Sequence, residues 1–362
     1  MFKFSLEARV QASRSAMLLM PVLAVFLTLI VSSGMFIFLN KPPLSALYSL
    51  LIEPLTTSYG VGEVLMKASP LLIIAQALAI GFRAKIWNIG ADGQLVVGAI
   101  CASYLAITFE NSSSIFLLPA MVFAGIFGGM LWAALAAILK TKFNANEILV
   151  TLMLSSVALQ LLYYLVAGPM RDPLGFNFPQ SIMFNEAATF SPIMEGVRVN
   201  SSIFLAILIS FLAWFFNKHS VHGFKMKVGG LAPSAAKYAG FNEKNTVWIG
   251  LLVGGAAAGI AGVGEVAGSL GILQRNISSG YGFAAIIVAF LGMLNPIGII
   301  FASIFMAIIY VGGDMALISV GIPKSSTTIF QGILLVMYLC CYLFVNYKIK
   351  LKRTVVRKLS NV

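Results

Sequence analysis

Long, uninterrupted apolar segments constrain this chain more than any other feature. The first, from Ala16 to Leu39, carries no charged residue and is long enough to cross the roughly 30 Å hydrocarbon core of a bilayer. Of the 362 residues, 59% are hydrophobic and only 10% are charged, whereas about 25% of the residues of a soluble domain are charged. The chain is therefore an integral membrane protein, and a soluble enzyme, a nucleic-acid-binding domain and a disordered chain are excluded.

Ten segments have the length and hydropathy of membrane spans. Because a span must satisfy its own backbone hydrogen bonds, the predicted fold class is an all-α polytopic membrane protein. The spans are predicted at about 16–39, 62–82, 92–110, 114–139, 147–168, 201–216, 247–271, 280–294, 297–313 and 327–346. The first has no signal-peptide cleavage site, and we expect it to stay uncleaved. Segments 280–294 and 297–313 are short for a bilayer, so a single re-entrant hairpin is the alternative there.

The distribution of basic residues predicts the orientation of the chain. Lys and Arg collect on the cytoplasmic loops of membrane proteins. With ten crossings, 18 of the 24 Lys and Arg lie on the same side as the N-terminus, 5 lie on the opposite side, and Lys67 lies inside a span. Both termini are therefore predicted to be cytoplasmic.

The order of the spans predicts two halves within a single transmembrane domain, residues 1–362. The halves cover about 16–168 and 201–346, and an external loop at about 169–200 joins them. Five spans in each half place the halves in opposite orientations, as in many transporters. Each half has a Gly-rich polar break before its third span, at Asn88–Gln94 and at Ser278–Gly282. Backbone freed at such breaks must face protein or a wet cavity, although glycines that only permit close helix packing would explain the same pattern.

Two acidic residues inside the predicted spans are candidates for function. A charge in the apolar core costs several kcal/mol and usually faces a cavity or a partner. Asp92 lies at the first break and Glu265 lies in the seventh span, where pathway lining and structural pairing or helix capping are the alternatives. Small residues spaced four apart, Gly254, Ala258 and Gly262, predict a helix-packing face in the same span.

The chain carries no motif for covalent chemistry or for nucleotide binding. It has no Gly-x-x-x-x-Gly-Lys-Ser/Thr, no His-Glu-x-x-His and no Gly-x-Ser-x-Gly, so we expect no catalytic residue, no bound cofactor and no intramembrane enzyme. His219 and His222 share one loop without a nearby cysteine, so no metal site is expected. Asn146 and Glu147 begin the fifth span as a helix cap and a first-turn acid.

The longest predicted cytoplasmic loop, about 217–246, contains a short helix. Pro233 suits a first helical turn, and Gly240 suits the position just after a helix end. A helix of this length is unstable alone in water, so it needs a surface to dock on. This favours a cytoplasmic partner, and a solvated connector held by the transmembrane helices is the alternative.

Several short motifs in a specific order carry a family resemblance over about residues 60–335. They are Gly81–Ala84, Asn88–Gly90, Gly93–Gln94, Asn146–Glu147, Val150–Leu154, Gly168–Pro173, Pro179–Ser181, Ala235–Gly240 and Gly280–Phe283, followed by Gly292 and Pro296. With these motifs the chain resembles the permease subunits of bacterial ABC importers of the simple-sugar and nucleoside class, relatives of ribose permeases. More narrowly, it looks like the larger permease of nucleoside importers that are fed by a basic-membrane-protein-type lipoprotein.

The resemblance implies partners and a location. The partners are a second, dissimilar permease, a cytoplasmic ATPase that binds ATP and Mg, and an external binding lipoprotein, all at the bacterial inner membrane. The resemblance also makes 233–240 a coupling helix, which transmits closure of the ATPase to the membrane. The implied coupling residues are Pro233, Ala235, Ala236, Lys237, Tyr238 and Gly240.

We therefore expect a permease that forms half of a pathway for a nucleoside, a purine nucleoside foremost. Candidate pathway residues are Asn88, Asp92, Gln94, Ser155, Ser156 and Glu265. The Ser155–Ser156 pair stands where the family has Asn-Tyr, which removes an aromatic ring able to stack on a base. Riboflavin or a simple sugar is accordingly an alternative solute. An ion-coupled secondary transporter is the alternative of another class, because inverted halves alone allow it.

Overall fold

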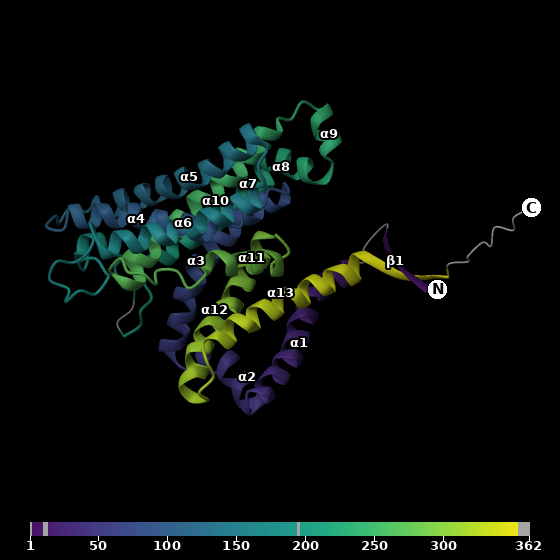
Figure 1. The fold of residues 1–362 in the computed structure, drawn as a ribbon, viewed down its shortest axis with the longest axis horizontal. Coiled ribbons are helices and arrows are strands. Elements are labelled where there is room, and N and C mark those ends of the chain that lie inside the picture. The colour runs from purple at the N-terminus through teal and green to yellow at the C-terminus, as the bar shows by residue number, and fades with distance from the viewer. Residues whose placement is uncertain (1, 10–13, 194–195, 354–362) are drawn as a thin grey trace, which may run out of the picture. The chain divides into compact units, whose positions relative to one another are not determined.

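The computed structural model describes residues 2–9, 14–193 and 196–353. The chain forms two compact units (Figure 1). Unit 1 comprises Met1–Leu47 and Val320–Val362, and unit 2 comprises Tyr48–Ser319. All twelve of the candidate site residues lie in unit 2.

Unit 1 brings the two ends of the described chain together. Helix α1 (Arg14–Phe38) packs against helix α13 (Ser325–Asn346). Strand β1 (Phe2–Ala8) pairs antiparallel with strand β2 (Tyr347–Arg353), from Phe2 opposite Arg353 to Ala8 opposite Tyr347. The beginning of α1 and the end of α13 therefore lie at the same end of this unit. This arrangement agrees with an even number of crossings, and the cytoplasmic placement of the termini stays a prediction. The strand pair itself was not predicted.

Unit 2 is built almost entirely of helices. Its main helices are α3 (Ser58–Arg83), α4 (Ala91–Thr108), α5 (Leu117–Phe143), α6 (Glu147–Ala167), α7 (Ser202–His219), α8 (Val221–Leu231), α9 (Pro233–Tyr238), α10 (Glu243–Gly264), α11 (Tyr281–Leu291) and α12 (Pro296–Ser319). Helix α2 (Pro43–Leu51) links the two units along the chain, and the 3-10 turns η1 (Glu53–Leu55) and η2 (Glu186–Ala188) lie in loops. The π-helical turn η3 (Glu265–Leu270) continues α10.

Local sequence signals explain where several of these helices begin. The Asn146 side chain accepts a hydrogen bond from the backbone nitrogen of Ile148 at 3.0 Å and caps α6, as predicted. Glu147 follows in the first turn and pairs with Lys140 at 2.8 Å. Thr57 caps α3 in the same manner, by accepting from the Gly60 nitrogen at 3.0 Å. Each cap satisfies a backbone N–H that has no partner within its own helix.

Nine helices among the described residues are long and apolar enough to cross a membrane, and this confirms the all-α polytopic class. The prediction of a full tenth span at 280–294 is wrong, because α11 has 11 residues and so reaches about 16 Å, half of a bilayer core. The re-entrant hairpin at 280–313 is wrong as well, because α12 is a continuous helix of 24 residues.

Residues 271–280 explain how so short a helix fits the bundle. Tyr281 at the beginning of α11 contacts Lys67 of α3, whereas Phe290 near its end stacks on Phe82 of α3 at a centroid distance of 5.4 Å. Helix α11 thus runs beside the Arg83 end of α3, and the irregular segment 271–280 precedes it from the end of η3. The external loop supplies partners for this irregular backbone, since the nitrogen of Leu273 donates to the Ser181 hydroxyl at 2.9 Å. Part of the freed backbone thereby finds a partner within the protein, as a membrane interior requires.

The packing in unit 2 repeats itself around α3 and α10. Helix α10 packs against α4 and α5, while α3 packs against α11 and α12, and the two central helices pack against each other. In this packing α3 corresponds to α10, α4 to α11, and α5 to α12. The two inverted halves stay a prediction. In Figure 1, α4, α5 and α10 lie side by side.

Small residues bring α10 close to its neighbours, as the spacing of Gly254, Ala258 and Gly262 predicts. A Cβ at Gly262 would overlap the carbonyl oxygen of Leu95 on α4, so a larger residue there would push the helices apart. Ala258 is fully buried between them. Close approach of backbones in this region is what allows buried polar groups on different helices to reach one another.

Candidate functional site

The two predicted breaks meet in the interior of unit 2. Helix α4 starts directly after the break at Asn88–Gly90, and α11 starts directly after Gly280. Their first turns touch, because a Cβ at Gly282 would lie only 2.6 Å from the Cα of Asp92 and would overlap its backbone nitrogen. The N-termini of two helices, each the positive end of a helix dipole, therefore face the same small region.

Asp92 occupies the position between these two helix ends. One of its carboxylate oxygens accepts a hydrogen bond from the backbone nitrogen of Gly282 at 3.0 Å and from the hydroxyl of Ser278 at 2.7 Å. The side chain is buried, with 4% of the residue exposed. A carboxylate at this position compensates for two helix dipoles and satisfies an unpaired N–H of α11. This geometry matches helix capping, one of the alternatives predicted for Asp92. The cap joins α4 to α11, two helices that are far apart in sequence.

Asn88 and Gln94 form a closed amide pair across the first break. The Asn88 amide nitrogen donates to the Gln94 side-chain oxygen at 2.8 Å, and the Gln94 amide nitrogen donates back to the Asn88 oxygen at 3.0 Å. Each residue is only 2% exposed. The same Asn88 oxygen accepts from the Gly90 nitrogen at 3.2 Å, so the pair braces the turn that leads into α4.

Ser155 and Ser156 lie about 100° apart around α6, so one side chain is buried and the other is exposed. Ser155 is buried, and its hydroxyl accepts a hydrogen bond from the Gly93 nitrogen at 3.3 Å, which ties α6 to the beginning of α4. Thr151, one turn earlier, accepts from the Ile89 nitrogen at 3.2 Å. Ser156 is exposed.

Glu265 belongs to a second polar cluster, in which three helices meet. Its side chain hydrogen-bonds the side chain of Tyr281 on α11, and its charge interacts with that of Lys67 on α3. The Lys67 ammonium donates to the same tyrosine hydroxyl, and lies 5.2 Å from the centre of its ring. Glu265 and Tyr281 are 3% and 1% exposed. Two opposite charges that share one hydroxyl reduce the cost of placing each of them among apolar helices.

Sequence reasoning missed Lys67 and Tyr281 as members of this cluster. Lys67 is the one basic residue that the predicted topology leaves inside a span, and a cation in that position needs a partner. The position of Lys67 inside a span indicates that it has an intramembrane acid as its partner. The sequence does not show that this acid is Glu265. The cluster borders a cavity of about 10 Å³ that Glu265 and Ser269 help to line, which is room for about one water molecule.

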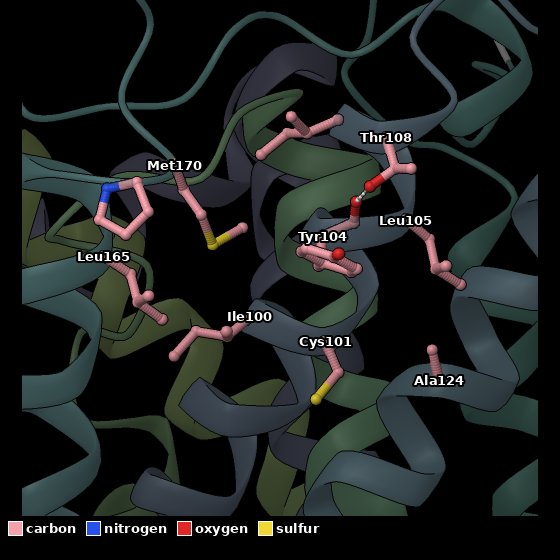
Figure 2. Close-up of a pocket in the computed structure, with 10 residues that line it drawn as sticks. Ile100, Cys101, Tyr104, Leu105, Thr108, Ala124, Leu165 and Met170 are labelled. Carbon is pink, nitrogen blue, oxygen red and sulfur yellow. Dashed lines mark hydrogen bonds between the residues drawn. The ribbon is translucent and has the colours of Figure 1, made fainter.

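A larger cavity of about 460 Å³ opens beside α4, α5 and the end of α6, and contains none of the candidate residues. Figure 2 shows its lining, in which Ile100, Cys101 and Tyr104 of α4 face Leu165 and Met170. The Thr108 hydroxyl donates to the backbone oxygen of Tyr104 at 2.7 Å, so it is satisfied within its own helix. The surface of this cavity is predominantly apolar, unlike the two polar clusters.

The short helix predicted in the 217–246 loop is present as α9, and α8 precedes it; its role in coupling stays a prediction. Pro233 stands in its first turn, and Gly240 follows its end with a left-handed φ of +76°. Ala236 is buried, Ala235 and Lys237 are exposed, and Tyr238 is 97% exposed. Helices α8 and α9 lie together at one end of unit 2 (Figure 1).

Apolar helices around broken helices with paired polar groups define a membrane transport permease, and comparison with known proteins supports this class. The model of the family described as branched-chain amino acid transport system / permease component matches residues 60–339. The chain belongs to this family. It is a multi-pass transmembrane permease of an ABC transporter, a transporter component rather than an enzyme.

Curated relatives from several organisms match most of this chain. The glucose ABC transporter permease protein TsgB13 of Haloferax volcanii is 32% identical over 91% of this chain and 89% of its own length. The guanosine ABC transporter permease protein NupP of Bacillus subtilis is 29% identical over 94% and 98%. The probable riboflavin import permease protein RfuC of Treponema pallidum is 24% identical over 77% and 75%. No solved structure matches the chain.

Proposed function

We propose that the chain is one of two dissimilar permease subunits of an ATP-driven importer in the bacterial cytoplasmic membrane. The observation that carries the proposal is α9, a helix of six residues that presents an aromatic side chain, Tyr238, at 97% exposure. A helix this short is not stable by itself in water, and an exposed aromatic beside Lys237 suits a protein partner. A cytoplasmic ATPase that holds ATP and Mg is the partner that a permease without a nucleotide motif needs.

The solute would pass along a face of α6 that unit 2 leaves uncovered. Only 22% of the most apolar window of this helix is buried. Ser156, Gln160 and Tyr164 recur there at four-residue intervals, and all three are exposed. A polar strip on one helix face does not suit lipid, whereas it suits a shared pathway between this chain and a second permease.

The chemistry of this strip favours a neutral, polyhydroxylated solute, with a nucleoside as the first candidate. Ser156 and Gln160 offer hydrogen bonds without charge, and Tyr164 supplies an aromatic ring that can stack on a base. The relatives are named for glucose, guanosine and riboflavin, and each of these solutes carries several hydroxyl groups on a sugar or a sugar-derived chain. A simple sugar and riboflavin are therefore the alternatives, and an external binding lipoprotein would select among them.

The test is co-purification of the tagged chain from its native host in mild detergent, with partners identified by mass spectrometry. We expect an ATPase and a second permease to be recovered. The triple variant Ala235→Asp, Lys237→Asp and Tyr238→Asp should lose the ATPase and keep the second permease. Lys244→Asp is the control, because it repeats the Lys-to-Asp change of the triple variant at an exposed position just beyond α9 and should retain the ATPase.

Two outcomes contradict the proposal. If the triple variant binds the ATPase as well as the unaltered chain does, α9 is not the coupling helix. If no ATPase is recovered in any preparation, an ion-coupled secondary transporter becomes the better explanation, and solute uptake should then follow an ion gradient.

A further inference from the structure

Arg83, the last residue of α3, connects two parts of unit 2 that lie far apart in sequence. Its guanidinium donates a hydrogen bond to the backbone oxygen of Leu294, in the turn between α11 and α12. Met293 and Leu294 both have left-handed φ angles, +56° and +55°. A turn with two such residues is restrained by its surroundings, because L-amino acids with branched or bulky side chains rarely adopt this conformation.

Aromatic side chains strengthen the connection between the end of α3 and α11. Phe290 stacks on Phe82 at 5.4 Å and on Trp87 at 6.0 Å, and Phe82 and Trp87 lie 5.1 Å apart. Three rings and one guanidinium thus hold the end of α11 against the end of α3. The beginning of α11 is held independently, by Asp92 and by the Lys67–Tyr281 contact.

Helix α8 packs on the same residue from the other side. A Cβ at Gly230 would overlap the carbonyl oxygen of Arg83 and would lie 3.2 Å from the Cα of Ala84. The adjacent Gly229 has nothing within 4 Å of the corresponding position. Helix α8 leads directly into α9, since only Ala232 separates them. Arg83 is therefore in contact both with the arm that carries α9 and with the turn that ends α11.

We infer that Arg83 is a positioning residue that passes a displacement of the α8–α9 arm to α11. The inference rests on the proposed function, because the displacement would come from an ATPase bound at α9. Backbone contact between Gly230 and Arg83 carries the movement into the end of α3. The Arg83 guanidinium and the Phe82–Trp87–Phe290 cluster carry it to α11, whose other end meets Asp92 and Glu265.

Trp87 provides a readout that needs no identified solute. In the complex with its ATPase, Trp132, Trp214 and Trp248 would be replaced by Phe, so that Trp87 is the remaining tryptophan. Adding ATP with vanadate traps the closed ATPase, and Trp87 emission reports whether the ring cluster rearranges. We expect a change in the unaltered complex and in Gly229→Ala. We expect Gly230→Ala to reduce its amplitude about fivefold or more, the size of a typical coupling.

Arg83 variants test the same step at the guanidinium. Arg83→Met should lose the Trp87 change although the complex still hydrolyses ATP, and Arg83→Lys should restore part of it, because an ammonium can donate one hydrogen bond to the Leu294 oxygen. If Arg83→Met does not fold, the comparison of Gly230→Ala with Gly229→Ala decides by itself. Equal amplitudes in these two glycine variants, or no Trp87 change in an unaltered complex that hydrolyses ATP, overturn the inference and leave the proposed function standing. Failure of the unaltered chain to bind any ATPase overturns both.

Discussion

The Asp92 carboxylate of α4 accepts a hydrogen bond from the backbone nitrogen of Gly282 of α11 at 3.0 Å. The two residues are separated by 190 positions in the chain, and each belongs to the first turn of a helix that follows a break. One buried carboxylate therefore holds together the first turns of α4 and α11, the two helices that follow the breaks.

Neutralising Asp92 should weaken this junction. Asp92→Asn keeps the size of the side chain but removes the charge that faces two helix N-termini. We expect the free energy of unfolding to fall by about 2 kcal/mol, because the variant loses hydrogen bonds to a charged group. Unfolding in mixed micelles measures the loss, and solute uptake should fall while membrane insertion persists. Asp92→Glu, which retains the charge, is the control. If the Asp92→Asn variant is as stable as the unaltered chain, Asp92 does not act as a helix cap.

Adding a methyl group at Gly282 should separate α4 from α11. The Cβ of Gly282→Ala would overlap the backbone of Asp92, and overpacking of this kind costs about 1 to 3 kcal/mol. Gly332→Ala in α13 is the control, because nothing lies within 4 Å of its Cβ position. Thermal unfolding in detergent should show a lower midpoint for the first variant only. Equal midpoints would mean that the first turns of α4 and α11 do not touch.

Lys67 and Glu265 should depend on each other for stability. Lys67→Met or Glu265→Gln alone removes one charged partner of the Tyr281 side chain, and each is expected to cost about 1.5 to 3 kcal/mol, as for a hydrogen bond to a charged group. The double variant should be less destabilised than the sum of the two single variants. A double-mutant cycle of unfolding free energies measures this coupling, and strict additivity would show that the two charges do not interact through Tyr281.

Ser156 should be accessible to water although it lies in a membrane-spanning helix. In a background that lacks Cys101, Cys340 and Cys341, a cysteine at position 156 should react about tenfold faster with a membrane-impermeant thiol reagent than one at Val157, because a thiol in an aqueous site ionises more readily than one in lipid. Val157 is also exposed, at 52%, but lies one residue around the helix. Equal labelling at both positions would argue against a pathway along the Ser156–Gln160–Tyr164 strip.

Much of the architecture follows from local patterns. Hydropathy placed nine long helices, because the bilayer requires about 20 apolar residues in each. The capping signal at Asn146 and the Pro233 and Gly240 signals around α9 were correct for the same reason, since each acts within one helical turn. The tenth span, predicted at 280–294, was wrong because α11 has only 11 residues, and the irregular segment 271–280 that precedes it is hydrogen-bonded to the distant Ser181.

The roles of the polar candidates depended on the tertiary structure. Asn88, Asp92 and Gln94 were predicted to line the pathway, and this stays a prediction. The structure adds that Asn88 and Gln94 brace the turn before α4 and that Asp92 caps α11. Ser155 and Ser156, adjacent in the chain, differ by about 100° around α6, and one is a buried packing residue whereas the other is a surface residue.

By itself, the sequence determined that this chain is a polytopic membrane permease, which family of permeases it belongs to, and where the short helix α9 lies. Those properties depend on composition, periodicity and short motifs, all of which are local. Only the tertiary structure decided that Asp92 meets Gly282, that Lys67 and Glu265 share Tyr281, and that Arg83 contacts both α8 and the end of α11. Contacts of this kind join residues on different helices, and their geometry is set by how closely small residues allow those helices to pack.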